Sequence, residues 1–199
     1  MQTMDEKSPT VLVIARPNGA GKTTFAKRYL PEFAEIGEFL NADMIAAGLS
    51  PFNPAGQAFL AGKLKLTRFD ELSKSRVSFG FESTLARRTH QRRLAHMKAD
   101  LGYRVIIVFL WLPSAVLAVL RVAGRVTQGG HDIPESVIRR RFAAGLSNFA
   151  NRYSQIADEW FVYNAVGFPL VRICRWNGSD LTISNLSIYD QFRETVPEL

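Results

Sequence analysis

Continuous apolar runs alternate with helical patterns along most of the chain. Residues 10–15, TVLVIA, and residues 103–112, YRVIIVFLWL, are rich in β-branched and other apolar side chains, which is typical of fully buried strands. Shorter strands are predicted at residues 38–43, 78–84, 160–163 and 169–176. Because strands and helices alternate, the pattern predicts βαβ units around a mostly parallel sheet, and hence an α/β fold.

The segments between these runs carry the apolar periodicity of helices. The expected helices run from about Lys22 to Leu30, from about Pro54 to residue 75, from Thr89 to Leu101, from Ser114 to about Thr127, from the IPES tetrapeptide (133–136) through Ile156, and over SIYDQFRETV (187–196). Pro31 is expected to end the first of them, since proline cannot continue a helix. Gly102 is expected to cap the helix that ends at Leu101.

Composition and charge narrow the classes of partner. The 199 residues suit a single domain, 1–199, with a core of its own, and 47% hydrophobic with 22% charged residues is ordinary for a globular protein. The net charge of +7 favours anionic partners, which include nucleotides, nucleic acid and acidic surfaces. Much of this excess charge is arginine, whose guanidinium suits bidentate recognition of phosphate.

The single cysteine, Cys174, excludes a disulfide framework and a cysteine zinc site, and it is expected in the core. The first ten residues contain no apolar run of signal-peptide length. The most apolar segment, residues 105–112, is too short to cross a bilayer. We therefore expect a cytoplasmic protein without a membrane partner.

The stretch GAGKTT, which follows the first predicted strand and opens the first predicted helix, is the ending of a phosphate-binding loop. Gly19 and Gly21 let the backbone turn and approach a polyphosphate closely. Lys22 would reach the β- and γ-phosphates of ATP, and the Thr23 hydroxyl would be a ligand of Mg²⁺. The predicted nucleotide-binding residues are Asn18, Gly19, Ala20, Gly21, Lys22, Thr23 and Thr24.

Arg16 stands where the usual loop pattern has its first glycine. An arginine costs strain there if the backbone requires a positive φ, and it costs little if the backbone is extended. Its guanidinium could also lie near the phosphates or obstruct the nucleotide. We expect the substitution to be tolerated, because the residues that would line the phosphates are intact.

Three further motifs, NADMIAAGLSPFNPAG, FGFESTL and GGHDIPESVIRRRF, together with the loop resemble the zeta toxin family of P-loop kinases. The resemblance extends from about Val11 to Trp176. It implies a nucleotide-kinase-like fold that transfers the ATP γ-phosphate to a sugar hydroxyl. In studied members of the family, that hydroxyl is the 3′-hydroxyl of the amino sugar in UDP-N-acetylglucosamine.

The resemblance also implies roles for residues on two strand ends. Asp43 would be the general base that accepts the proton of the attacking hydroxyl, and Glu82 and Thr84 would contact the acceptor. Taken alone, Asp43 could instead be the N-cap of a helix over residues 44–48. Glu82 could instead help to hold Mg²⁺ through water.

Phosphoryl transfer needs cations around the transferring oxygens. Arg121 and Arg125 lie one turn apart on a predicted helix and so share a face. With the arginines of residues 139–141 beyond a glycine pair, they suggest a lid over about residues 114–145, which would exclude water on closure. Consecutive helical residues point in different directions, so we assign the catalytic cations as Arg121, Arg125 and Arg140.

Two nearby features receive plainer interpretations. The three histidines show no ligand spacing, so His131 and Asp132 are not predicted to bind a metal. Asp132 is instead expected to help start the following helix. Asn164 follows a late strand, where nucleotide kinases often place the adenine, but the family pattern of Asp-Asn is incomplete here.

The sequence thus predicts a Mg²⁺-dependent kinase, using ATP, whose acceptor is a nucleotide sugar or a related small molecule. It could be the toxin of a pair in which a separate antitoxin protein blocks the ATP site. An ATP-binding regulatory module with impaired catalysis is the alternative, with Arg16 as its first sign. An RNA-binding role is not expected, because no RNP-like motif or aromatic sheet signature is present.

Overall fold

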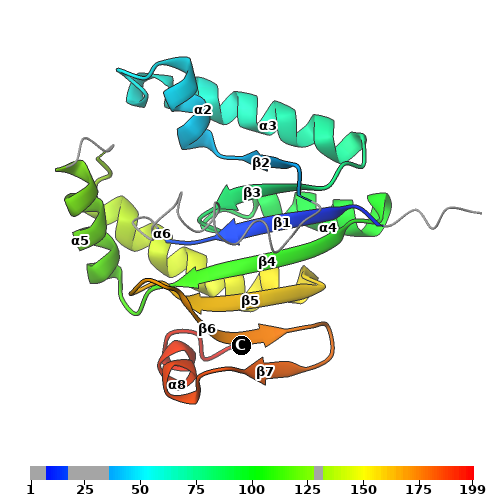
Figure 1. The fold of residues 1–199 in the computed structure, drawn as a ribbon, viewed down its shortest axis with the longest axis vertical. Coiled ribbons are helices and arrows are strands. Elements are labelled where there is room, and N and C mark those ends of the chain that lie inside the picture. Colours follow the sequence, from blue (N-terminus) through cyan, green and yellow to red (C-terminus); the bar gives the residue numbers. More distant parts are fainter. Residues whose placement is uncertain (1–7, 18–35, 128–131) are drawn as a thin grey trace, which may run out of the picture.

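The computed structural model describes residues 8–17, 36–127 and 132–199. Within these ranges a seven-stranded sheet runs in the order β2-β3-β1-β4-β5-β6-β7 (Figure 1). The strands are β1 (Thr10–Ala15), β2 (Glu38–Leu40), β3 (Phe79–Ser83), β4 (Arg104–Trp111), β5 (Glu159–Asn164), β6 (Val171–Trp176) and β7 (Leu181–Ile183). The first five pair in parallel, whereas β6 and β7 are antiparallel to their neighbours. The predicted α/β fold with a mostly parallel sheet is therefore confirmed.

Apart from α2, the described helices lie where the periodicity indicates, although the one helix predicted through Ile156 is divided into α6, η3 and α7. They are α2 (Ala42–Leu49), the 3₁₀ helix η2 (Ala55–Gln57), α3 (Ala58–Lys74), α4 (Thr89–Leu101), α5 (Ala115–Val126), α6 (Glu135–Asn148), the π-helix η3 (Phe149–Tyr153), α7 (Ser154–Ile156) and α8 (Leu186–Thr195). Gly102 ends α4 in the left-handed conformation, with φ 68°, as expected of a glycine cap. The Ser114 hydroxyl caps α5 by accepting from the Leu117 N–H. The helix predicted from Lys22 lies outside the described residues.

Alternate residues of the central strands pack on opposite faces of the sheet. Val11 and Val13 lie in a core formed with α3, α4, α8 and η3, and Cys174 is buried in the same core. Leu12 and Ile14 lie in a second core with α5 and the start of α6. A buried strand that contacts helices on both faces is apolar at every position, which is why residues 10–15 show no alternation.

Two sequence expectations about helix starts are wrong. The segment 38–43 is not strand throughout, because β2 ends at Leu40 and Asn41 caps α2. Asp43 is therefore neither at a strand end nor an N-cap; it lies in the first turn of α2. Pro134 is the N-cap residue of α6, and no side chain of the described residues caps this helix with a hydrogen bond. Asp132 therefore does not start it.

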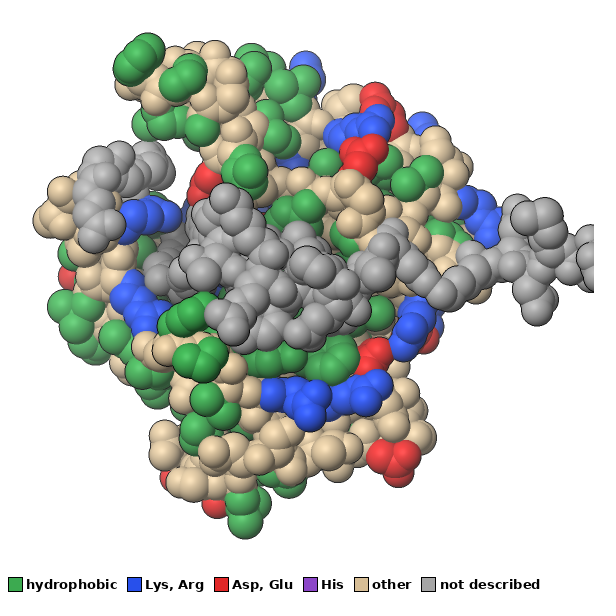
Figure 2. Space-filling view, viewed as in Figure 1, with side chains coloured by type: hydrophobic (Ala, Val, Ile, Leu, Met, Phe, Trp, Pro, Cys, Tyr) green, Lys and Arg blue, Asp and Glu red, His purple; other side chains and the backbone are tan. Residues whose placement is uncertain are grey.

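Two features of the surface complete the description. Among the described residues, no helix combines the length and the apolar composition that a bilayer crossing requires. Exposed hydrophobic side chains gather over α2, η2 and the start of α3 (Figure 2), and they are Met44, Leu49, Phe52, Phe59 and Leu60. In the same view the surface is hollowed between α2 and the end of α5.

Candidate functional site

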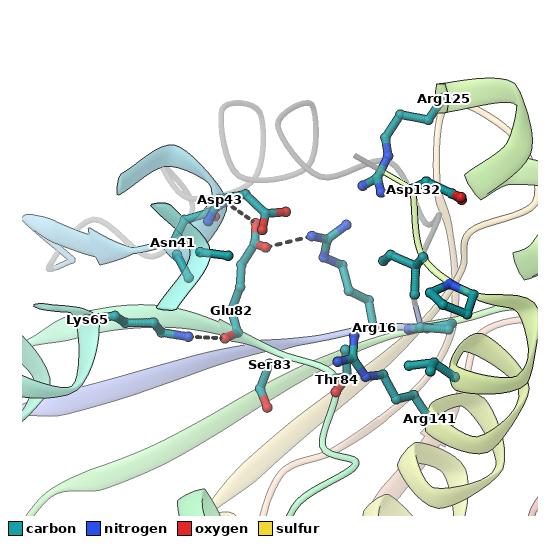
Figure 3. Close-up of a pocket in the computed structure, with 16 residues that line it drawn as sticks. Arg16, Asn41, Asp43, Lys65, Glu82, Ser83, Thr84, Arg125, Asp132 and Arg141 are labelled. Atoms are coloured by element: carbon teal, nitrogen blue, oxygen red, sulfur yellow. Dashed lines mark hydrogen bonds and ion pairs between the residues drawn. The ribbon is translucent and has the colours of Figure 1, made fainter. Parts of the chain in front are cut away.

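A pocket of about 480 Å³ opens at the carboxyl ends of β1 and β3 (Figure 3). Parallel α/β sheets bind ligands at this edge, because helix N-termini and strand ends converge there. The pocket is lined by Arg16, Pro17, Asn41, Ala42, Asp43, Ala58, Lys65, Glu82, Ser83, Thr84, Arg125, Asp132, Ile133, Pro134, Val137 and Arg141. It therefore brings together residues from the first strand, from the α2–α3 region and from both predicted lid helices.

One side of the pocket is lined by Arg16, Asn41, Asp43, Lys65 and Glu82. We call this side the floor. The Glu82 carboxylate is its centre: Oε2 accepts from the Arg16 guanidinium at 2.6 Å and Oε1 accepts from the Asn41 amide at 3.0 Å. The Lys65 ammonium donates to the Glu82 carbonyl oxygen at 2.6 Å, which ties α3 to the end of β3. The two cations and two carboxylates of the floor balance in charge.

Asn41 has two functions in this arrangement. Its side-chain oxygen accepts from the N–H groups of Asp43, at 2.8 Å, and Met44, at 3.2 Å, and so caps α2. Its amide nitrogen donates to Glu82. The cap places the Asp43 carboxylate in the first helical turn, where the helix dipole stabilises a negative charge. Asp43 is exposed to the pocket.

The backbone conformation of Arg16 does not require a glycine at this position of the loop pattern. Its N–H donates to the Ser83 carbonyl at 3.1 Å, which continues the pairing of β1 with β3 beyond the strand. In the part of the chain that the structure describes, positive φ values at non-glycine residues occur only at Arg76 and Leu85. Burial lowers the pKa of the Arg16 guanidinium, the charge of Arg125 lowers it further, and Glu82 and Asp43 oppose both effects. The side chain is directed toward Glu82 (Figure 3).

Helix α6 fixes the segment that leaves β3. Leu85 has a φ of 54°, and its N–H is held by the Ser83 hydroxyl at 3.0 Å. The Asn148 amide donates to the Leu85 carbonyl at 2.8 Å. A Cβ at Gly145 would come within 2.6 Å of the Thr84 carbonyl oxygen, so only glycine permits this approach. The expected acceptor residue Thr84 is thus held from the helix behind it.

The opposite wall, which we call the lid wall, consists of Arg125 from α5, Asp132, and Arg141 from α6. Burial is the main cause that lowers the pKa of Arg141, and the charges of Arg87 and Arg140 lower it further. Asp43, across the pocket, opposes this shift. The lid wall therefore crowds positive charge at the pocket, a condition that an anionic ligand would relieve.

The predicted lid arginines divide into three placements. Arg125 lines the pocket. Arg121 instead donates to both carbonyl oxygens of residues 165–166 at 2.6 Å, and so joins α5 to the segment after β5. Arg140 is exposed and does not line the pocket, whereas Arg141 does. Pocket residues Pro134, Val137 and Arg141 recur at helical spacing, and that signal could have selected Arg141.

Other predicted site residues are placed as follows. Residues 18–24, with the predicted phosphate-binding Lys22 and the Mg²⁺ ligand Thr23, lie outside the described residues, as does His131. Asn164 ends β5, and its side chain accepts from the Val166 N–H at 3.0 Å. Sequence reasoning missed Asn41 and Lys65; the first carries a cap signal before a helix, and the second carries none.

The described part of the pocket has the charges that a polyphosphate requires. Pro17, the last described residue before the glycine-rich loop in the sequence, lines the pocket. Arg125 and Arg141 provide cations for phosphate oxygens, and the Asp43 and Asp132 carboxylates also line the pocket, where they could contact hydrated Mg²⁺ through water. Among residues 8–17, 36–127 and 132–199, no cluster of three or more His, Cys, Asp or Glu side chains forms a metal site by itself.

Solved structures with low sequence identity share this fold. A chain of the AvrRxo1-ORF1:-ORF2 complex with ATP has a TM-score of 0.71 and 18% identity, covering 98% of this chain and 66% of that one. A chain from the PezAT chromosomal toxin–antitoxin system of Streptococcus pneumoniae has a TM-score of 0.66 and 15% identity, covering 98% and 80%. The resemblance to the zeta toxin family is thereby confirmed at the level of fold. This chain spans about two thirds of the AvrRxo1 chain.

Sequence comparison gives two further matches. An uncharacterized protein of Haemophilus influenzae is 27% identical over 125 residues, which is 63% of this chain and 86% of that protein. The model of the AAA domain family AAA_33 matches residues 11–150, a segment that runs from β1 through α6 and contains the glycine-rich loop. Since this match covers more than half of the sequence, the chain belongs to the AAA domain family AAA_33 and has a P-loop kinase-like fold.

Proposed function

We propose that this protein is an ATP-dependent kinase that phosphorylates a hydroxyl of a nucleotide sugar, such as UDP-N-acetylglucosamine, or of a related acceptor. One observation carries the proposal: the Asp43 carboxylate lines the same pocket as Arg125 and Arg141, on the side that faces these arginines. A proton acceptor and phosphate-binding cations at the end of β1 are what phosphoryl transfer requires.

Asp43 is the proposed general base. The acceptor hydroxyl attacks the γ-phosphorus, the bond from that phosphorus to the β,γ-bridging oxygen breaks, and the hydroxyl proton passes to Asp43. In the first turn of α2 the helix dipole favours its negative charge, and the residue lines the cavity. A positioned base of this kind contributes about 100- to 10,000-fold in rate.

The cations of the lid wall have a different function in this proposal. Arg125 and Arg141 contact the phosphate oxygens, and the predicted Lys22 completes the set from the loop. Bound Mg²⁺ would supply further neutralisation of the charge on the phosphates. Arg121, which is tied to residues 165–166, supports the lid and does not contact phosphate in this proposal.

The domain organisation and the partner are also proposed. The chain forms one kinase domain in which about residues 114–145 close over the pocket as a lid and exclude water. The likeness to chains from two complexes, one named a toxin–antitoxin system, supports a separate inhibitory protein as partner. The exposed hydrophobic side chains over α2, η2 and α3 provide apolar surface for such a partner. ATP as the phosphate donor places the reaction in the cytoplasm.

An ATP-binding module without catalysis is the second candidate. The observation that favours it is Arg16, which departs from the loop pattern and occupies the pocket floor. The kinase is favoured because Asp43 lines the same pocket as Arg125 and Arg141.

A transfer assay separates the two candidates. The protein is mixed with ATP, Mg²⁺ and a panel of UDP-sugars, and ADP and phosphorylated product are measured by a coupled assay and mass spectrometry. Wild-type protein is expected to yield a phosphorylated sugar, Asp43→Asn to lose about 100- to 10,000-fold in kcat, and the control Asp190→Asn on the distant helix α8 to lose less than about tenfold. ATP binding with no product on any acceptor would reject the kinase, and full activity of Asp43→Asn would reject Asp43 as its general base.

A further inference from the structure

The floor contains an ion pair that the loop pattern does not anticipate. Arg16 occupies the place of the first loop glycine, and its side chain is only 4% exposed. It lies 2.6 Å from the Glu82 carboxylate, whose side chain is 10% exposed. A guanidinium so buried loses most of its hydration, and burial is the largest cause that lowers its pKa. The contact with Glu82 compensates for this loss.

Two donors hold the Glu82 carboxylate from different elements. Arg16 extends from the end of β1 to Oε2, and Asn41 extends from the start of α2 to Oε1. Lys65 holds the backbone of the same residue from α3. A glutamate side chain has three rotatable torsions, and donors to both of its oxygens restrain the orientation of the planar group. The orientation of Glu82 is therefore determined by contacts that span the floor.

The fixed carboxylate retains capacity for a ligand. An ionised carboxylate accepts about four hydrogen bonds, and the two side-chain donors use about half of them. Glu82 lines the pocket, so its remaining lone pairs are available to hydroxyl groups there. A charge-assisted hydrogen bond from a sugar hydroxyl to such a carboxylate is strong and directional.

We infer that Arg16 is a positioning residue for the acceptor: it holds the Glu82 carboxylate oriented to receive acceptor hydroxyl groups, and it does not serve the nucleotide. The inference rests on the proposed function and deepens it, because it assigns the departure from the loop pattern to recognition of the acceptor. Replacement of Arg16 then changes the KM for the acceptor more than the KM for MgATP.

The test compares Arg16→Gly, which restores the usual loop residue, with Arg16→Lys, Glu82→Gln and the double variant Arg16→Gly/Glu82→Gln. We expect Arg16→Gly to raise the KM for the acceptor by about 10- to 100-fold and to change the KM for MgATP by less than about threefold. Arg16→Lys should recover part of the loss, because an ammonium can still reach one carboxylate oxygen. The double variant should be no worse than the worse single variant, since both changes remove the same contact.

Three kinetic results would overturn the inference. A higher KM for MgATP with an unchanged acceptor KM would assign Arg16 to the nucleotide. A gain in acceptor kcat/KM for Arg16→Gly would make Arg16 an obstruction. Additive losses in the double variant would show that the two side chains act separately.

Two measurements without turnover distinguish this failure from that of the proposed function. If wild-type protein transfers no phosphate, the kinase is rejected, and calorimetric binding of UDP-N-acetylglucosamine decides the inference. Weaker binding to Arg16→Gly than to wild type would support it, and equal or undetectable binding to both would overturn it. Urea unfolding of wild type, Arg16→Gly, Glu82→Gln and their double variant gives the coupling between Arg16 and Glu82, and the absence of coupling would overturn the inference whether or not the protein is a kinase.

Discussion

The two walls of the pocket differ in how their charges are balanced. On the floor, Arg16 and Asn41 both donate to Glu82, so each charge lies beside an opposite charge or a dipole. On the lid wall, burial lowers the pKa of the Arg141 guanidinium, and the neighbouring charges of Arg87 and Arg140 lower it further. The charged groups of the floor are balanced by one another, whereas an anionic ligand would offset the positive charge of the lid wall.

The difference indicates which side of the pocket would bind each substrate. A neutral hydroxyl needs fixed hydrogen-bond acceptors and a base, which the floor provides through Glu82 and Asp43. A polyphosphate needs concentrated positive charge, which Arg125 and Arg141 provide. We therefore expect variants of the two walls to affect different substrates.

The largest effect is expected on the lid wall. Arg141→Gln should lower kcat/KM by about 100- to 1000-fold, because it removes a cation at the phosphates. The free energy of unfolding should stay equal or rise, since the change relieves repulsion from Arg87 and Arg140. Steady-state kinetics measure kcat/KM, and urea unfolding measures the free energy of unfolding. The control is Arg139→Gln on the same helix, where the arginine pairs with Glu135 at 2.7 Å; an equal loss there would refute the assignment.

The contribution of the buried His90 to folding stability should be lost in acid. The His90 ring packs against Phe81 and Phe69, and burial, followed by the charges of Lys65 and Arg93, lowers its pKa to about 4. Because the unfolded value is about 6.5, the folded state binds fewer protons between these values. This contribution to stability is complete above about pH 6.5 and is lost as the pH falls toward 4, by about 3 kcal/mol in total.

Urea unfolding between pH 7.5 and 4 measures this dependence. His90→Phe should flatten the pH profile while the exposed control His96→Gln keeps it. A profile unchanged by His90→Phe, or flattened by His96→Gln, would contradict the assignment.

The contact between α6 and the floor depends on one glycine. Gly145→Ala should destabilise by about 1–3 kcal/mol and raise the acceptor KM, because its Cβ would press on the Thr84 carbonyl. The matched control is Gly124→Ala in α5, where nothing lies within 4 Å of an added Cβ, and it should stabilise by about 0.5–1 kcal/mol. Thermal unfolding compares them, and similar losses in both would show that the close approach is unimportant.

The smallest effect separates the two functions of Asn41. Asn41→Ser keeps a cap for α2 but loses the donor to Glu82, so stability should change by only a few tenths of a kcal/mol. The acceptor KM should rise by about three- to tenfold. Asn41→Ala should lose both functions and about 1 kcal/mol more. If the serine variant matches wild type in KM, the Asn41 amide does not orient Glu82.

The fold was largely predictable because its signals are local. The buried runs of β1 and β4, the glycine after α4 and the serine before α5 each determine structure within a few residues. Two details were not predicted, for different reasons. Strand β7 is only three residues long, which is too short for a periodicity to be recognised, and the Asn41 cap ends β2 earlier than β-propensity indicates.

The site was predictable only in part, because its contacts are distant in sequence. Asp43, Glu82, Thr84 and Arg125 all line the predicted pocket edge. The partner of Glu82 is Arg16, 66 positions away, and no local pattern reveals such a pair. The choice of Arg140 over Arg141 depended on the rotation of α6, which the packing of Ile138 and Leu146 against the sheet determines.

Calorimetric binding of MgATP to Arg141→Gln and Glu82→Gln, side by side with wild type, tests the division between the walls most directly. The account predicts that Arg141→Gln weakens MgATP by at least about tenfold, whereas Glu82→Gln stays within about twofold of wild type. Weaker binding to Glu82→Gln than to Arg141→Gln, or an equal loss in both, would contradict it.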